Sequence, residues 1–117
     1  MPNQSSSLDL VFHALSDPTR RAIVHRLSRG PASVSELAKP FAMAMPSLLQ
    51  HLRVLEESRL IRTEKVGRVR TCAVEPAALD TAQAWIAQQR ALWEGRLDRM
   101  EGFVATLKSK EKKHGKR

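Results

Sequence analysis

The chain has 117 residues, of which 42% are hydrophobic and 27% charged, so one folded domain fits and wholesale disorder is excluded. The net charge is +8, and the last ten residues, KSKEKKHGKR, hold six of the 20 Lys and Arg residues, which favours a polyanionic partner. The single cysteine, Cys72, excludes an internal disulfide. No stretch approaches the ~18 apolar residues of a membrane span, so we expect a cytoplasmic protein without a membrane partner.

The first predicted element is a helix that follows a polar, flexible N-terminus of residues 1–7. Ser7 stands where it can cap this helix. Its apolar stripe has helical spacing and consists of Leu8, Val11, Phe12 and Leu15.

A second helix is predicted from Asp17, a favoured cap, and Pro18, which suits the first helical position. It stops at Gly30-Pro31. Its predicted buried residues are Ala22, Ile23 and Leu27. A third, short helix opens at Ser35–Ala38 and ends before Pro40.

The stretch from Met43 to Leu60 predicts a fourth helix with one apolar and one polar face. The predicted buried face is Met45, Leu48, Leu52 and Leu55. The opposite face is Pro46, Ser47, Gln50, Arg53 and Val54. Leu49 and His51 lie on the two flanks. Two short helices joined by a tight turn, the second polar on its outer side, indicate a helix-turn-helix.

After Leu60 the pattern changes to two short strands, IRTEKV and VRTCAV, around Gly67-Arg68. Gly67 occupies the position that a type II′ hairpin turn prefers. Against one acidic residue, Glu64, the hairpin carries four basic residues, Arg62, Lys65, Arg68 and Arg70. A basic hairpin directly after a helix-turn-helix indicates the wing of a winged helix.

A long helix is predicted from Pro76 to about Lys108. Its seam repeats every seven residues at Leu79, Ile86, Trp93, Met100 and Leu107, with Ala82, Leu97 and Val104 between them. Such a seam is long enough to pack against another helix. Residues 109–117 are predicted to form a basic, disordered tail.

These elements predict a mainly α fold with a small β-hairpin, namely a winged helix-turn-helix of about five helices with a two-stranded wing. We expect a single DNA-binding domain over residues 8–108.

Three segments together resemble the ArsR family of bacterial winged-helix repressors. They are LSDPTRRAI from Leu15, SELA from Ser35 and MPSLLQHLRVL from Met45. The resemblance covers residues 8–107. The chain departs from the family at both ends of the fourth helix. The family usually has Ser just before this helix, where this chain has Ala44, and often has Gly at its end, where this chain has Arg59.

The resemblance implies a homodimer that represses transcription from an inverted-repeat operator in double-stranded DNA. The segment WEGRLDRM, from Trp93, looks like a branch of the family without a metal site. The first and last helices would form the dimer interface. The interface residues this implies are Leu8, Val11, Phe12, Leu15, Ile86, Trp93, Leu97, Met100, Val104 and Leu107.

Ser47 and Gln50 are the main candidates for base contacts, since Gln pairs bidentately with adenine and Ser serves as donor or acceptor. The alternative is local, because Ser47-x-x-Gln50 also fits a capping box that would use both side chains on backbone groups. His51 contacts the DNA or is bonded within the domain. Leu49 either touches a thymine methyl or belongs to the core, the second being the more ordinary use of an apolar flank.

Backbone contacts are expected from the remaining basic residues and the helix start. Arg53 faces outward, where a solvated side chain is the alternative to a phosphate contact. The predicted backbone set is Pro46, Arg53, Arg62, Lys65, Arg68 and Arg70.

Metal, redox and catalytic functions lack support in the sequence. Residues 76–108 contain no His and the chain has one Cys, so the carboxylate–histidine and thiolate routes to metal sensing are missing, and we expect no cofactor. Cys72 is either redox-active or a small buried hydrophobe. No phosphate loop or nucleophile motif indicates an enzyme, and no pattern identifies a small-molecule effector.

The competing hypothesis is a protein-interaction module whose long helix binds a different partner. Two residues favour this hypothesis: Ala44 has no side-chain acceptor to cap the fourth helix, and Leu49 is apolar. Both weaken the case for a DNA-reading helix.

Overall fold

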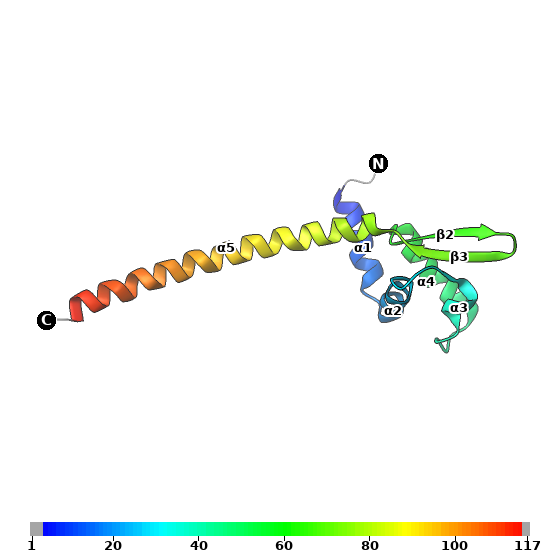
Figure 1. Ribbon diagram of the computed structural model, residues 1–117, viewed down its shortest axis with the longest axis horizontal. Helices are drawn as coiled ribbons and strands as arrows, with labels where there is room; N and C mark the ends of the chain where they lie inside the picture. Colours follow the sequence, from blue (N-terminus) through cyan, green and yellow to red (C-terminus); the bar gives the residue numbers. More distant parts are fainter. Residues whose placement is uncertain (1–3, 116–117) are drawn as a thin grey trace. The chain divides into compact units, whose positions relative to one another are not determined.

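The computed structural model describes residues 4–115, and the side chains of residues 7–110. The chain is mainly helical with one antiparallel sheet, as the sequence predicts (Figure 1). Its elements are α1 Gln4–Leu15, α2 Pro18–Leu27, β1 Ala32–Ser33, α3 Val34–Ala38, α4 Met45–Glu57, β2 Ile61–Val66, β3 Val69–Val74 and α5 Pro76–Gly115. They divide into two compact units after Ala82, the first holding α1 to the start of α5 and the second the rest of α5.

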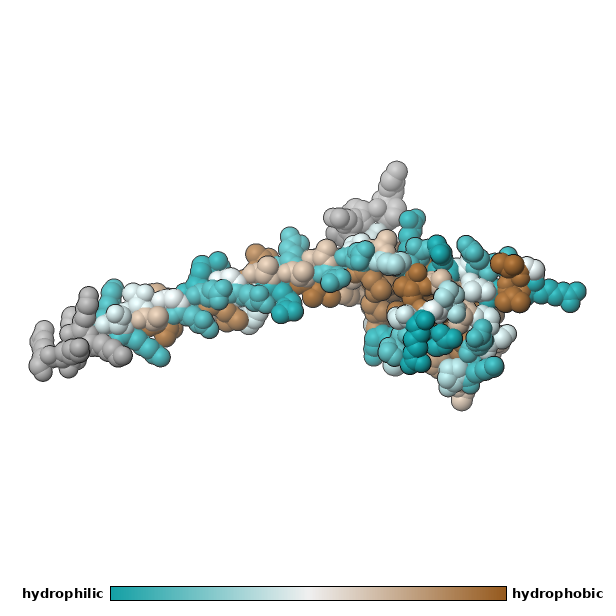
Figure 2. Space-filling model, viewed as in Figure 1, coloured by the Kyte–Doolittle hydropathy of each residue, from teal (hydrophilic) through white to brown (hydrophobic). Residues whose placement is uncertain are grey.

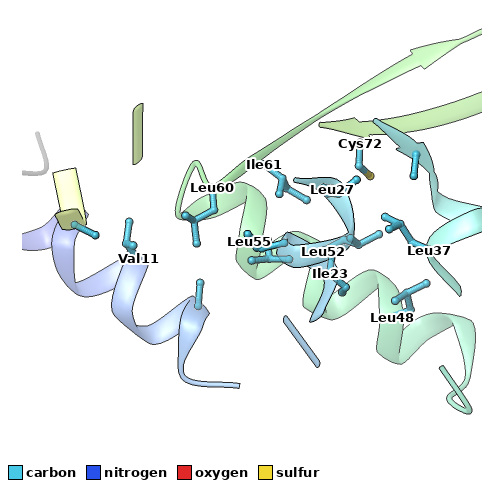
Figure 3. Packing of buried hydrophobic residues seen from close by; sticks show 14 residues of the cluster. Val11, Ile23, Leu27, Leu37, Leu48, Leu52, Leu55, Leu60, Ile61 and Cys72 are labelled. Carbon is cyan, nitrogen blue, oxygen red and sulfur yellow. The ribbon is translucent and has the colours of Figure 1, made fainter. Parts of the chain in front are cut away.

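The core of the first unit lies between the helices and the sheet. Figure 3 shows Leu48, Leu52 and Leu55 of α4 beside side chains from α2 and the strands. All three leucines are buried, and burying one leucine side chain contributes roughly 1.5–3 kcal/mol. These leucines therefore hold α4 firmly on the domain.

The ends of α1 and α2 follow the expected chemistry with one correction. α1 begins at Gln4, so Ser7 lies inside the helix and the predicted cap is wrong; helix ends are weakly specified by the apolar stripe alone. The start of α2 is confirmed, because the Asp17 carboxylate accepts a hydrogen bond from the Arg20 backbone N–H at 3.0 Å and Pro18 follows it.

The buried face of α2 is rotated from the predicted one: Ala22 is not on it, and Val24 and Arg20 are. Ile23 and Leu27 are buried as expected, whereas Ala22 is exposed and Val24 is buried in its place. Residues 20, 23, 24 and 27 share one face of a helix, and residue 22 lies away from it.

A third strand precedes α3. β1 pairs antiparallel with β3, so the strand order is β1-β3-β2 and β2 lies at one edge. Two residues are too short a strand for alternation to be seen in a sequence. α3 begins at Val34 and not at Ser35, because Ser33 and Glu36 form a capping box with bonds of 3.1 and 3.2 Å.

The hairpin of β2 and β3 has the predicted register and turn. Val66 pairs with Val69 across Gly67-Arg68. Gly67 has φ +63° while Arg68 stays in the negative range that most residues prefer. Positive φ at the first central residue alone fits a type II′ turn, the type that Gly67 favours in the sequence.

The end of α4 is closed by a left-handed residue, Arg59, at φ 63°. The N–H of Leu60 donates to Leu55 O at 3.1 Å and that of Arg59 to Glu56 O at 2.9 Å, the two bonds of a Schellman motif. Glycine usually fills this position, so the backbone demand is met here by a residue with a steric cost.

α5 continues past the predicted end at Lys108 to Gly115. Lys and Glu fill much of this extension, and both are good helix formers. Of the predicted flexible N-terminus and tail, residues 1–3 and 116–117 lie outside the described residues. No described helix is long and apolar enough to span a membrane.

Candidate DNA-binding surface

α4 presents a polar face to solvent opposite its buried leucines. Ser47, Gln50 and Arg53 are exposed, as predicted. Met45 is 44% exposed and so is not part of the buried face, because the first turn of α4 extends beyond the core. Val54 is half-buried and packs on the core cluster, so its predicted place on the outer face is also wrong.

The start of α4 decides how Ser47 and Gln50 are used within the domain. The helix begins at Met45, and the cap residue Ala44 makes no side-chain bond. Ser47 is therefore the third helical residue, and its backbone N–H donates to Ala44 O at 3.0 Å. Neither its hydroxyl nor the Gln50 amide makes a hydrogen bond within the described residues, so the capping-box alternative is wrong.

The two flanks of α4 are tied to the domain. Leu49 is half-buried and packs against the core cluster, the more ordinary of its two predicted uses. The His51 ring lies with Nδ1 3.2 Å from Arg20 Nη1 and 3.8 Å from Asp17 Oδ2. The intradomain bond predicted as one alternative for His51 is therefore formed.

Arg20 is a buried charge that the sequence does not reveal. Only 8% of its surface is exposed, and its Nε and Nη2 donate to the carbonyl oxygens of Ala14 and His13 at 2.7 and 3.0 Å. These carbonyls lie in the last turn of α1, where a helix leaves acceptors unused. No residue pattern marks such partners, because they are backbone atoms.

Asp17 lies close to the same cluster. The hydrogen bond from the Arg20 backbone is the largest effect and lowers the pKa of Asp17 below its ordinary 3.8, against a smaller opposing effect of desolvation; the nearby Arg20 guanidinium, and His51 when it is protonated, lower it further. The carboxylate is therefore charged at neutral pH and caps α2 in that form.

Cys72 lies in the core, in the middle of the sheet. Its side chain is fully buried, and burial raises the pKa of the thiol, so less thiolate is present at neutral pH. This is the small buried hydrophobe of the two predicted alternatives.

The four basic residues of the wing divide into two kinds. Arg62 pairs with Glu75 and Arg70 with Glu56, each at 3.2 Å. Lys65 and Arg68 are exposed, and among the described side chains neither has an ion-pair partner. Both carboxylates lie outside the hairpin, Glu56 in α4 and Glu75 in the link between β3 and α5, so the predicted backbone contacts of Arg62 and Arg70 compete with an ion pair.

The second unit exposes an apolar surface along α5, part of which is visible in Figure 2. The exposed seam residues are Ile86, Trp93, Leu97, Met100, Val104 and Leu107. On α1, Phe12 is also exposed, whereas Leu8 and Leu15 are half-buried. Val11 belongs to the core of its own domain, which removes it from the predicted interface.

No cluster of three or more His, Cys, Asp or Glu residues that could hold a metal lies within the described part of the chain. The candidate DNA-binding surface consists of α4 and the wing. It offers hydroxyl, amide, imidazole and guanidinium groups on α4 and basic side chains on the wing. These groups bind acceptors and negative charges, as on nucleic acid.

Comparison with known proteins decides the family. A model described as a helix-turn-helix domain matches residues 15–64. The HTH-type transcriptional regulator Rv2034 of Mycobacterium tuberculosis is 42% identical over 73 residues, 62% of this chain and 68% of that protein. A crystal structure of an ArsR family transcriptional regulator is 56% identical, with TM-score 0.75 over 80% of this chain and 97% of the other.

The chain belongs to the ArsR family. An ArsR-like transcriptional regulator from Rhodococcus sp. RHA1 has TM-score 0.73 and 30% identity, covering 85% of this chain and 93% of its own. The transcriptional repressor SdpR of Bacillus subtilis is 30% identical over 76 residues, 65% of this chain and 84% of SdpR. As an ArsR-family protein with a winged helix-turn-helix, the chain is a DNA-binding transcriptional regulator, and the resemblance seen in the sequence is confirmed.

Proposed function

We propose that α4 enters the major groove of duplex DNA and reads sequence with Ser47 and Gln50. The supporting observation is that both side chains are exposed on a helix anchored by three buried leucines, with no hydrogen bond used inside the domain. A glutamine amide at the groove pairs bidentately with adenine, and each such pair discriminates by about 1–3 kcal/mol. Leu49 contributes only the edge that the core leaves uncovered.

Positive charge around α4 would fix the register on the DNA backbone. Arg53 and the start of the helix at Pro46 would face phosphates in the major groove. Lys65 and Arg68 would contact the flanking backbone, since neither charge is neutralised within the described domain. Arg62 and Arg70 would contribute less, because each would have to leave a carboxylate.

Two copies of the chain would act together. The exposed apolar seam of α5 is unusual for a surface, and a second copy would bury it. Two α4 helices related by a two-fold axis would then read an inverted repeat, with half-sites about 34 Å apart. Occupying a promoter in this way would repress transcription, the activity named for SdpR.

The proposed activity is binding and not catalysis, and it is placed in the cytoplasm with the DNA. Metal sensing is not part of it, since the donor sets for the thiolate and carboxylate–histidine routes are missing from the sequence. The competing function is a protein-interaction module. It is still favoured by Ala44, which gives the first turn of α4 no side-chain cap.

A titration of labelled duplex DNA with the whole chain at two salt concentrations separates the two functions. The duplex is one selected by the chain from a random pool, and a scrambled duplex of equal length is the control. We expect steep salt dependence for both duplexes and tighter binding of the selected one. Weak binding that is equal for both duplexes would favour the protein-interaction module.

The base-reading step is tested with Gln50→Ala. We expect preference at one base position of each half-site to relax by about 1–3 kcal/mol, because the bidentate pair is lost. Gln88→Ala, at an exposed glutamine of α5, is the matched control and should leave specificity unchanged. Unchanged specificity in Gln50→Ala would remove Gln50 from the reading face.

A further inference from the structure

The Arg20 guanidinium joins three elements of the first unit. It belongs to α2, donates to the carbonyl oxygens of His13 and Ala14 at the end of α1, and lies with Nη1 3.2 Å from Nδ1 of His51 on α4. Arg20 is 92% buried, so its position is set by these partners and not by solvent. The link therefore fixes the His51 ring relative to α1 and α2.

The chemistry of the two groups fixes the tautomer of the ring. A guanidinium has five N–H donors and no acceptor, so the bond between Arg20 and His51 requires an unprotonated Nδ1. The proton of the neutral imidazole then sits on Nε2. Asp17 Oδ2, at 3.8 Å from Nδ1, is too distant to compete for a hydrogen bond with the neutral ring.

The Nε2 atom is left for a partner outside the domain. It makes no hydrogen bond among the described residues. Every buried side-chain nitrogen or oxygen among these residues has a hydrogen-bond partner. Because Nε2 has none, it is not buried and is accessible to solvent. His51 directly follows Gln50, and 22% of its side chain is exposed at the edge of the polar face of α4.

We infer that Arg20 is a positioning residue for DNA binding, which holds the His51 ring so that Nε2–H donates to an acceptor on the DNA. The acceptor is a phosphate oxygen or a nitrogen or oxygen on a base edge, since both accept an N–H donor. This inference rests on the proposed function of α4. It adds a donor of fixed tautomer beside Ser47 and Gln50 and explains why a charged residue is buried under the reading helix.

Two isosteric substitutions separate the two sides of the ring. In His51→Asn the amide oxygen can replace Nδ1 as acceptor for Arg20, but no atom replaces Nε2. In His51→Gln the amide nitrogen can replace Nε2, and no acceptor replaces Nδ1. We expect H51N to keep wild-type thermal stability and to bind the selected duplex about three- to tenfold more weakly, the usual effect of one hydrogen bond. H51Q should recover part of that loss, and His25→Asn, at an exposed histidine of α2, should change neither property.

A double-mutant cycle then tests whether Arg20 acts through His51. Arg20→Met removes the donors at similar length, and its fold is checked by circular dichroism. We expect R20M to weaken DNA binding in the wild-type background and to add no further loss in the H51N background. An equal loss in both backgrounds, or wild-type affinity in H51N, would overturn the inference.

A spectroscopic readout covers the case in which R20M does not fold. Nitrogen-15 NMR of the wild-type ring near pH 8 should find the His51 proton on Nε2 and none on Nδ1, whereas a proton on Nδ1 would contradict the bond to Arg20.

A loss in H51N that is uniform across duplexes identifies a phosphate as acceptor, and a loss confined to one base pair identifies a base. If wild type shows no sequence-specific binding, the proposed function fails; if it does and only the variants deviate, this inference alone fails.

Discussion

At the scale of single residues, Asp17 gives the fold a defined response to acid. Its folded-state pKa is lowered, first by the hydrogen bond from the Arg20 backbone, so the stability it contributes is present above about pH 4 and is lost as the pH falls through the folded-state value. Asp17→Asn keeps a capping oxygen without a titrating group. We predict a smaller loss of unfolding free energy between pH 7 and pH 3 in D17N than in wild type, measured by urea unfolding. Equal losses would mean that Asp17 does not carry this pH dependence.

Arg59 offers a second prediction at this scale. Its left-handed conformation costs a non-glycine residue about 1–2 kcal/mol, part of which the greater freedom of glycine in the unfolded chain offsets. Arg59→Gly should therefore raise the free energy of unfolding by about 0.5–1 kcal/mol. Arg59→Ala is the matched control and should bring no gain, because alanine keeps the same steric conflict; a gain in R59A would point to charge as the cause.

Sequence rules predict some of the contacts between neighbouring residues, and they predict none of the contacts that Arg20 makes with distant partners. The Asp17 cap follows from the residues beside it, whereas the equally local capping box of Ser33 and Glu36 begins α3 before the predicted Ser35. Arg20 bonds to carbonyls of the preceding helix and to a ring 31 residues away, which no local pattern encodes.

At the scale of elements, the wing should contribute to binding through its tip more than through its base. Arg68→Ala should lower the slope of log affinity against log salt by about 0.9, since one phosphate contact is lost. Arg62→Ala should lower it by less than half as much, because the Arg62 charge already pairs with Glu75 at 3.2 Å. Titration of the selected duplex across several salt concentrations measures both slopes, and equal decreases would show that the Glu75 pair does not restrain Arg62.

The sequence predicts that α4 is a helix with one buried face, but it does not predict every residue of that face. The spacing of Leu48, Leu52 and Leu55 identifies its buried face, because three positions on one stripe require a core opposite them. Spacing does not say where that core ends, so it predicts a buried Met45, which the structure shows exposed. The sequence does not predict the short strand β1, because its residues Ala32 and Ser33 pair with Cys72 and Thr71 of β3, 40 and 38 positions further along.

At the scale of the whole molecule, the seam on α5 predicts self-association. Sedimentation equilibrium at micromolar concentration should give twice the mass of the chain. Leu97→Lys should shift the chain toward monomer, because a charge would be buried in an apolar interface. Gln88→Lys lies on the other side of α5 and should remain dimeric. A monomeric wild-type chain would contradict the two-fold arrangement proposed for the reading helices.

The sequence selected by the chain from a random pool of duplex DNA tests the central claim most directly. If two copies present α4 to successive major grooves, the enriched sequences should contain an inverted repeat with half-site centres about 10 base pairs apart. An enriched site without two-fold symmetry, or a pool with no enriched sequence, would contradict it.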